Sequence, residues 1–373
     1  MAASSGAIGR ERLEDYLAGV FGVPVEVLAV RRLGAAEGDG DPKGLGYGVP
    51  LEVECRVGDE RRQLVVSRTR PVQGFGHDYP ADRAWQAIYA HSAYNSFPAH
   101  VKSLDVGFVR ASGALVSAGD AAEFFQLVEK APGRLYWLDL ERLLSQPLVP
   151  RDGERARALA RFLARAHRDK RDEPALYQRR IRELVGHGEC LMGILDSYPR
   201  PWPLLPPEQC EALERALVSW RWRLRGRVAR LSRVHGDFHP WNLLFGDGVD
   251  FAVLDRSRGE WGEPADDVSA LGINYLFFGL RKSAAAGGRS IAEPFASLFR
   301  AFLDTYLAES GDREVLDVLP PFMSFRALVI AHPRWYPALD DGTRRALLRF
   351  ALAMAGPIRF DPDALPGLLE DAA

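Results

Sequence analysis

The sequence predicts an α+β protein with two lobes, a small antiparallel β-sheet lobe at residues 1–132 and a larger, mainly helical lobe at residues 133–373. Two observations support this fold class. Segments rich in β-branched residues are concentrated before residue 70, whereas apolar residues at helical spacing dominate after about residue 135. With 373 residues, of which 47% are hydrophobic and 26% charged, the chain is long enough for two core-forming units.

The first lobe is expected to begin with a helix and continue as a sheet. Apolar residues at helical spacing, among them Leu13 and Leu17, place the helix at 10–21, and Gly22 ends it. The remaining elements of this lobe are strands at 25–33, 50–57 and 61–69, a helix at 81–94, and further strands near 104–118 and at 123–129.

Helical patterns dominate the second lobe. Leu159, Phe162 and Leu163 line one face of a helix that Asp152 is expected to cap. Further helices are expected near 174–196, 207–229, 264–281, 291–309 and 343–355. Two short strands, LSRVHG and DFAVLD, flank the segment HGDFHPWNLLF at 235–245.

Charge and cysteine content narrow the class of function. A formal net charge of -2 removes the main driving force for broad binding to nucleic acid or to an anionic membrane, so small-molecule chemistry is expected. Cys55, Cys190 and Cys210 are too far apart in the sequence to suggest a disulfide framework. The lack of such a framework is typical of proteins in a reducing compartment. The N-terminus does not resemble a signal peptide, and the apolar stretch at 268–280 is too short to span a bilayer. A cytoplasmic protein is therefore predicted.

The segment at 235–245 permits two chemical interpretations. His235, Asp237 and His239 alternate along an extended segment and are candidate ligands of a transition metal in a hydrolase. Alternatively, Asp237 is the base of a phosphoryl-transfer loop and Asn242 offers a neutral oxygen to magnesium, which prefers hard oxygen ligands. A hairpin through DFAVLD would then bring Asp255 beside Asn242, so that the two share a metal site.

Three motifs in order resemble those of the aminoglycoside phosphotransferase and choline kinase family. HGDFHPWNLL at 235–244 resembles the catalytic loop of that family, and VLD at 253–255 resembles its metal-binding aspartate motif. GEPADDVSAL at 262–271 resembles the segment whose aspartate, here Asp267, braces the catalytic loop, with His235 also structural. The resemblance covers roughly residues 25–281 and implies a two-lobed protein-kinase-like fold, ATP and Mg²⁺ as cofactors, and a hydroxyl-bearing small molecule as acceptor.

The same resemblance implies nucleotide contacts in and beside the first lobe. FFQLVEKAPG resembles the segment between the lobes, so the backbone of Glu129 and Ala131 is expected to bond the adenine edge. Arg68, which shares a strand face with Val66, is the expected phosphate-binding cation, with Arg70 as second choice. The family usually pairs this cation with a glutamate, which is absent between residues 61 and 122, so Asp82 or Asp78 is expected instead. The glycine-rich segment offers Gly44, Gly46 and Gly48 to the phosphates.

The leading hypothesis is therefore an ATP-dependent small-molecule kinase. A nucleotide-binding regulator with little catalysis is the alternative that the missing glutamate and irregular glycine spacing suggest, and a metal hydrolase is the third. Arg256 and Arg258 follow the metal-binding aspartate and indicate a neutral or anionic acceptor, because they would repel a polycation. The acceptor's identity and the oligomeric state stay open at this stage.

Overall fold

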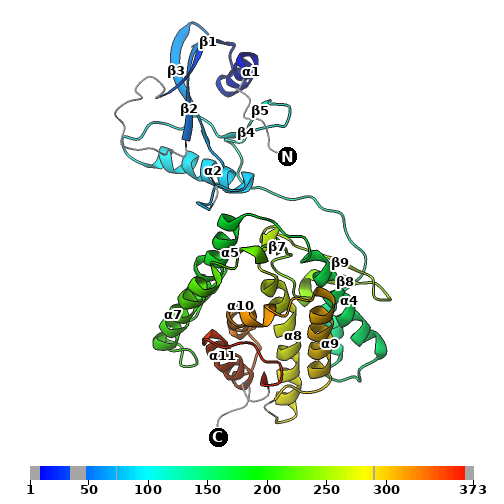
Figure 1. The fold of residues 1–373 in the computed structure, drawn as a ribbon. Coiled ribbons are helices and arrows are strands. Elements are labelled where there is room, and N and C mark those ends of the chain that lie inside the picture. The colour runs from blue at the N-terminus through cyan, green and yellow to red at the C-terminus, as the bar shows by residue number, and fades with distance from the viewer. Residues whose placement is uncertain (1–8, 34–47, 73, 289, 366–373) are drawn as a thin grey trace. The chain divides into compact units, whose positions relative to one another are not determined.

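A computed structural model describes residues 9–33, 48–72, 74–288 and 290–365 (Figure 1). The chain divides into two compact units, Met1–Val128 and Glu129–Ala373. Their small antiparallel sheets and many helices confirm the predicted α+β class. Within the described residues, no helix combines the length and apolar character that crossing a membrane requires.

The first unit is built on a three-stranded antiparallel sheet in the order β1-β2-β3. The strands are β1 (Val25–Arg32), β2 (Gly48–Val57) and β3 (Glu60–Thr69), and helix α1 (Arg10–Phe21) precedes them. Leu13 and Leu17 of α1 form a core with residues of β1 and β2. Helix α1 ends where predicted, because Gly22 adopts φ 70° and donates its backbone N–H to the carbonyl of Ala18.

The rest of the first unit differs from the prediction in one segment. Helix α2 (Pro80–Ser96) and the hairpin of β4 (Gly107–Val109) and β5 (Leu115–Ser117) lie where a helix and strands are expected. The strand predicted at 123–129 is wrong, since this segment has no regular secondary structure. No described strand pairs with this segment, and a strand needs a partner to satisfy its backbone groups. Its apolar residues Phe125 and Leu127 are 92% and 91% exposed.

The second unit contains most of the helices. They are α3 (Tyr136–Arg142), α4 (Pro150–Ala166), α5 (Pro174–Gly186), α6 (Leu191–Ser197), α7 (Pro207–Leu224), α8 (Pro264–Ala285), α9 (Phe295–Ser310), α10 (Val315–Ala331) and α11 (Asp341–Ala355). Short strands β6 (Arg134–Leu135), β8 (Leu243–Phe245) and β9 (Phe251–Val253) form one antiparallel sheet, and β7 (Ser232–Arg233) pairs with β10 (Trp261–Gly262). The 3₁₀ turns η1 (Val228–Arg230) and η2 (Pro240–Asn242) lie before β7 and before β8.

Helix α8 lies at the centre of this unit (Figure 1). Nearly all of its residues are buried, as expected for a helix that is apolar on every side, and it packs against both α9 and α10. Asp152 caps α4 from its first turn, where it accepts the backbone N–H of Val149 at 2.9 Å.

Helix α10 is not among the individual helices that the sequence pattern predicts. Pro320 and Pro321 lie inside it, and proline removes a helical hydrogen bond and crowds the preceding turn. The helix forms nonetheless because most of its side chains, including Phe322 and Phe325, are buried against α8 and α11. This matters for function, because α10 supplies a residue to the candidate site.

Candidate active site

Residues 235–242 are the part of the expected catalytic loop that precedes β8, and they lie between the two short sheets of the second unit. The loop leaves β7, which pairs with β10, and enters β8 through η2. Gly236 adopts φ 87°, and a Cβ there would lie 3.1 Å from the Cβ of Arg258. Glycine is therefore required at this position for both its backbone conformation and the close approach of Arg258.

Asp267, in the first turn of α8, anchors this loop. Its fully buried carboxylate accepts the backbone N–H of His235 at 2.8 Å and that of Gly236 at 2.7 Å, and His167 contacts it at 3.1 Å. Burial opposes ionisation, but the hydrogen bond and charge of His167 and the backbone donors outweigh it and lower the pKa of Asp267. An ionised carboxylate therefore fixes the backbone of the loop.

Replacing Asp267 with asparagine is expected to destabilise the fold by on the order of 3 kcal/mol, because an amide places donors against backbone donors inside the core. Urea unfolding would measure this, with Asp304→Asn, on the exposed face of α9, as the matched control. Because folding lowers the pKa of Asp267, its ionised carboxylate stabilises the folded state at pH values above the usual pKa range of a carboxyl group. The difference between wild type and variant should shrink as the pH falls through the lowered value.

His235 is occupied within the loop. Its Nε2 bonds the backbone carbonyl of Leu254 at 2.8 Å, and its Nδ1 accepts the backbone N–H of Asp237 at 3.2 Å. Both ring nitrogens are thus used, which removes His235 from the ligand set of the metal-hydrolase interpretation. Among the described residues, no group of three or more His, Cys, Asp or Glu side chains is arranged to hold a metal ion.

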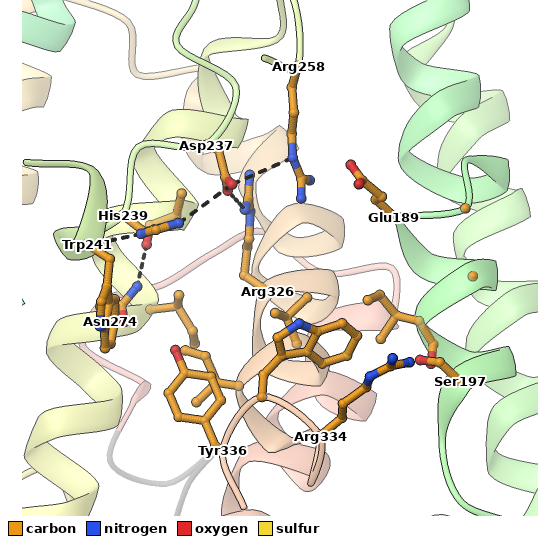
Figure 2. A pocket seen from close by; sticks show the side chains of 18 residues that line it. Glu189, Ser197, Asp237, His239, Trp241, Arg258, Asn274, Arg326, Arg334 and Tyr336 are labelled. Atoms are coloured by element: carbon orange, nitrogen blue, oxygen red, sulfur yellow. Dashed lines mark hydrogen bonds and ion pairs between the residues drawn. The ribbon is translucent and has the colours of Figure 1, made fainter. Parts of the chain in front are cut away.

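Asp237 presents its carboxylate to a cavity and is surrounded by cations (Figure 2). Oδ1 forms an ion pair with Arg326, whereas Oδ2 has only longer contacts, at 3.6 Å to Nε2 of His239 and 3.6 Å to Nε of Arg258. Burial opposes its ionisation, but Arg326, His239 and Arg258 together hold the pKa of Asp237 far below the usual range. The side chain is therefore a carboxylate at any physiological pH.

Arg326 of α10 is a residue of the cavity wall that the sequence prediction missed. It is buried, pairs with Asp237, and donates to Oδ1 of Asp266 and to the carbonyl of Gly236 at 2.6 and 2.9 Å. Burial raises the pKa of Asp266, and Arg326 opposes that shift. A signal was available, because a lone arginine in the apolar run FMSFRALVIA must find buried acidic partners.

Asn242 and Asp255 are brought to one end of the β8–β9 hairpin. Leu243 pairs with Val253, and the backbone N–H of Leu254 donates to the carbonyl of Asn242 at 2.8 Å. Asn242 Nδ2 donates to the carbonyl of Asp237 at 3.1 Å, which leaves Oδ1 without a donor among the described residues. Asp255 is exposed to solvent, and its backbone adopts φ 49°. No ion pair to its carboxylate is found in the described part of the chain. Two hard oxygen ligands are thus available, which fits Mg²⁺.

The residues predicted to bind the phosphates of the nucleotide lie in the first unit. Arg68 shares the partly buried face of β3 with Leu64 and Val66, as the alternation predicts. Asp82 accepts the backbone N–H of Tyr79 at 2.8 Å at the start of α2. Asp82 and Arg68 both lie within the described residues, and no ion pair is found between them. Gly48 opens β2, whereas Gly44 and Gly46 lie outside the described residues.

Glu129 and Ala131 lie in the segment without regular secondary structure that precedes β6. Glu129 is exposed and Ala131 is partly buried. The roles of these two residues, of Arg68 and Asp82, and of the glycines in binding a nucleotide stay predictions.

The cavity that Asp237 faces has a volume of about 560 Å³ and is formed within the second unit. We call it the Asp237 cavity. Its wall comes from the expected catalytic loop, from α6 and the segment before it, from α8 and α10, and from the segments after β9 and α10. It includes Trp241, Asn274, Trp335 and Tyr336. A mostly apolar wall with a few polar side chains is typical of a site for a small molecule of sugar or drug size.

Several solved structures are similar to this chain at low sequence identity. No curated protein sequence matches the chain. A solved structure of glucosamine kinase in complex with glucosamine, ADP and inorganic phosphate is similar, with 17% identity, 97% of this chain and 99% of that chain covered, and a TM-score of 0.38. A macrolide 2'-phosphotransferase from Brachybacterium faecium is similar with 15% identity and a TM-score of 0.31, and the match covers 94% of this chain and 99% of that chain. An ethanolamine kinase from Plasmodium vivax is similar with 9% identity and a TM-score of 0.35, and the match covers 89% of this chain and 81% of that chain.

The sequence profile of the phosphotransferase enzyme family (APH) matches residues 55–314, well over half of the chain. The match includes all three motifs whose resemblance to this family the sequence shows. It confirms that resemblance and the expected enzyme class of small-molecule kinase. The chain belongs to the phosphotransferase enzyme family.

Proposed function

We propose that the protein transfers the γ-phosphoryl group of ATP to a hydroxyl group of a small molecule bound in the Asp237 cavity. The observation that carries this proposal is the position of the Asp237 carboxylate. It lines a cavity of about 560 Å³, and Asn242 of the same loop lies within hydrogen-bond reach of the Asp237 backbone. A phosphoryl transfer needs a positioned hydroxyl and stabilised phosphate oxygens more than covalent help from the protein.

The two oxygens of Asp237 have different roles in this proposal. Arg326 holds Oδ1 and so fixes the orientation of the carboxylate. Oδ2, with contacts no closer than 3.6 Å, is the oxygen that the acceptor hydroxyl approaches. A carboxylate with so low a pKa is a weak base, so it chiefly orients the hydroxyl and takes up its proton late in the transfer.

Asn242 and Asp255 would hold Mg²⁺, since both offer hard oxygens at one end of the β8–β9 hairpin. The ion supplies neutralisation of charge on the phosphate oxygens when bound. In the same proposal, Arg68 and the glycine segment with Gly44, Gly46 and Gly48 contact the phosphates, Asp82 supports Arg68, and the backbone of Glu129 and Ala131 bonds adenine.

Replacing Asp255 with asparagine is expected to lower kcat about 100-fold or more and to raise the Mg²⁺ concentration needed for half-maximal rate. The variant keeps an oxygen but loses the negative charge that a divalent cation requires. A Mg²⁺ titration of the rate of ADP formation would measure both effects. Asp304→Asn is the matched control, and an unchanged Mg²⁺ dependence in Asp255→Asn would contradict the assigned role.

The proposed function is tested by incubating the purified full-length protein with Mg-ATP and hydroxylated small molecules. We expect ADP and a phosphorylated acceptor to form in equal amounts. Tight Mg-ATP binding without transfer, unaffected by Asp237→Asn, would instead favour a nucleotide-binding regulator. Stoichiometric zinc in the purified protein would favour a metal hydrolase.

A further inference from the structure

Five charged side chains line the Asp237 cavity: Glu189, Asp237, Arg258, Arg326 and Arg334. Arg326 is committed to Asp237 and Asp266, and Arg258 contacts Asp237 at 3.6 Å. Figure 2 shows the carboxylate of Glu189 directed toward Arg258, whereas Arg334 points toward Ser197 and away from Asp237. Within the described residues, no hydrogen bond or ion pair to the guanidinium of Arg334 is found. Arg334 is therefore the cation of this wall that is free for a ligand.

The segment that carries Arg334 is held in place from both sides. The backbone N–H of Arg334 donates to Nδ1 of His332 at 3.0 Å, and Nε2 of that ring lies 3.1 Å from the hydroxyl of Ser197 in α6. On the other side, Arg344 of α11 donates to the carbonyls of Ala331 and Leu339 at 2.7 and 3.1 Å. The base of the Arg334 side chain is thus fixed before any ligand binds, which reduces the entropy lost on binding.

A buried amide oxygen at the same cavity also lacks a hydrogen-bond donor among the described residues. Asn274 of α8 is 3% exposed and donates Nδ2 to the carbonyl of Ala270 at 2.7 Å, but its Oδ1 has no donor among the described residues. An unsatisfied buried acceptor is costly, so a ligand that offers a hydroxyl donor here would relieve that cost. This favours an acceptor with more than one hydroxyl group.

A guanidinium presents paired N–H donors that match the two oxygens of a carboxylate or phosphate. An ammonium group beside Arg334 would meet like charge, whereas the carboxylate of Glu189 is directed toward Arg258. Since Arg334 and Asp237 point to different parts of the cavity, a single molecule would place its oxyanion at one and its reacting hydroxyl at the other.

We propose that the phosphate acceptor is an anionic polyhydroxy compound, whose carboxylate or phosphate group is bound by Arg334 while one hydroxyl meets Asp237. This inference rests on the proposed function. In the reaction, the hydroxyl oxygen bonds to the γ-phosphorus of ATP as the bond from that phosphorus to the β,γ-bridging oxygen breaks. ADP leaves with the electron pair, and the hydroxyl proton passes to the Asp237 carboxylate.

A sugar series that differs in charge tests the proposal. Glucose, glucosamine, glucuronate and glucose 6-phosphate share one ring and are neutral, cationic, carboxylate-bearing and phosphate-bearing. We expect kcat/KM for glucuronate or glucose 6-phosphate to exceed that for glucose by about tenfold or more, with glucosamine the poorest. The better of the two anions identifies the oxyanion. Transfer only to glucose or glucosamine, or to none of the four, would overturn the anionic assignment.

Variants of Arg334 separate a charge effect from a structural one. Arg334→Gln should reduce kcat/KM for the anionic sugar at least tenfold more than for glucose, mainly through KM. Arg334→Glu should invert the order of glucosamine and the anionic sugar, which a merely structural residue would not do. Arg345→Gln, at an exposed position of α11 outside the cavity, is the matched control and should leave all four values unchanged. An unchanged preference in Arg334→Glu would contradict the role of Arg334.

Failure of this inference can be told apart from failure of the proposed function. Hydrolysis of Mg-ATP by water in the absence of acceptor, abolished by Asp237→Asn, reports the phosphotransferase site alone. If that hydrolysis is present but no anionic preference is found, only the acceptor class is wrong. If neither hydrolysis nor transfer is seen in any reaction, the proposed function fails as well.

Discussion

Replacing Asp237 with asparagine is expected to lower kcat for phosphoryl transfer by about 10²–10⁴-fold while changing KM for ATP little. The amide cannot take up the hydroxyl proton, and it leaves Arg326 with Asp266 as its remaining carboxylate partner. Steady-state kinetics with the best acceptor of the sugar series would measure the effect.

Asp304→Asn, which changes an exposed aspartate in the same way, should retain wild-type kcat. Circular dichroism and thermal unfolding of both variants would show that the loss is not caused by unfolding. If Asp237→Asn kept more than about a tenth of the wild-type kcat, an assignment of Asp237 as the base would be untenable.

Replacing Arg326 with methionine is expected to have the second large effect, on both stability and activity. Within the described residues, Arg326 is the cation that forms ion pairs with both Asp237 and Asp266. The change therefore leaves Asp266 without this partner and leaves Asp237 with only the longer contacts to His239 and Arg258. Breaking a buried ion pair from one side costs on the order of 3–5 kcal/mol. Urea unfolding would measure this loss, with Arg345→Met on the exposed face of α11 as the control.

The pH profile of the Arg326→Met variant tests a role beyond folding. Asp237 acts as a carboxylate, so kcat/KM falls as the pH drops through its pKa. In the wild type Arg326 helps to hold that pKa far below the usual range, and the acid limb should be absent down to the pH at which the protein unfolds. Without Arg326, burial is opposed only by His239 and Arg258, so the limb should move to higher pH. An unshifted profile would make Arg326 purely structural.

Much of the fold follows from local sequence patterns. Helix α1 begins and ends at the predicted residues because apolar spacing and Gly22 determine both its face and its end. The pattern failed where distant contacts decide the outcome. Helix α10 forms despite Pro320 and Pro321 because it is buried on nearly every side, and the predicted strand at 123–129 does not form because no described strand pairs with it.

The candidate site shows the same division. The sequence could place Asp237, Asn242 and Asp255 near one another because their spacing is set by one loop and one hairpin, which are local in sequence. Arg326 was missed because its contact with Asp237 spans 89 residues and depends on how α10 packs against α8. Of the two arginines after Asp255, Arg256 bonds the carbonyls of Val234 and Glu260, so only Arg258 lines the cavity.

In the proposed reaction, Asn242 and Asp255 hold the metal while Asp237 meets the acceptor hydroxyl. A crystal structure of the full-length protein with Mg²⁺, a non-hydrolysable ATP analogue and the best acceptor of the sugar series would test it most directly. We expect Mg²⁺ about 2.1 Å from Oδ1 of Asn242 and from a carboxylate oxygen of Asp255, with an acceptor hydroxyl about 2.6–3.2 Å from Oδ2 of Asp237. A metal bound elsewhere, or an acceptor whose hydroxyl groups all lie away from Asp237, would contradict it.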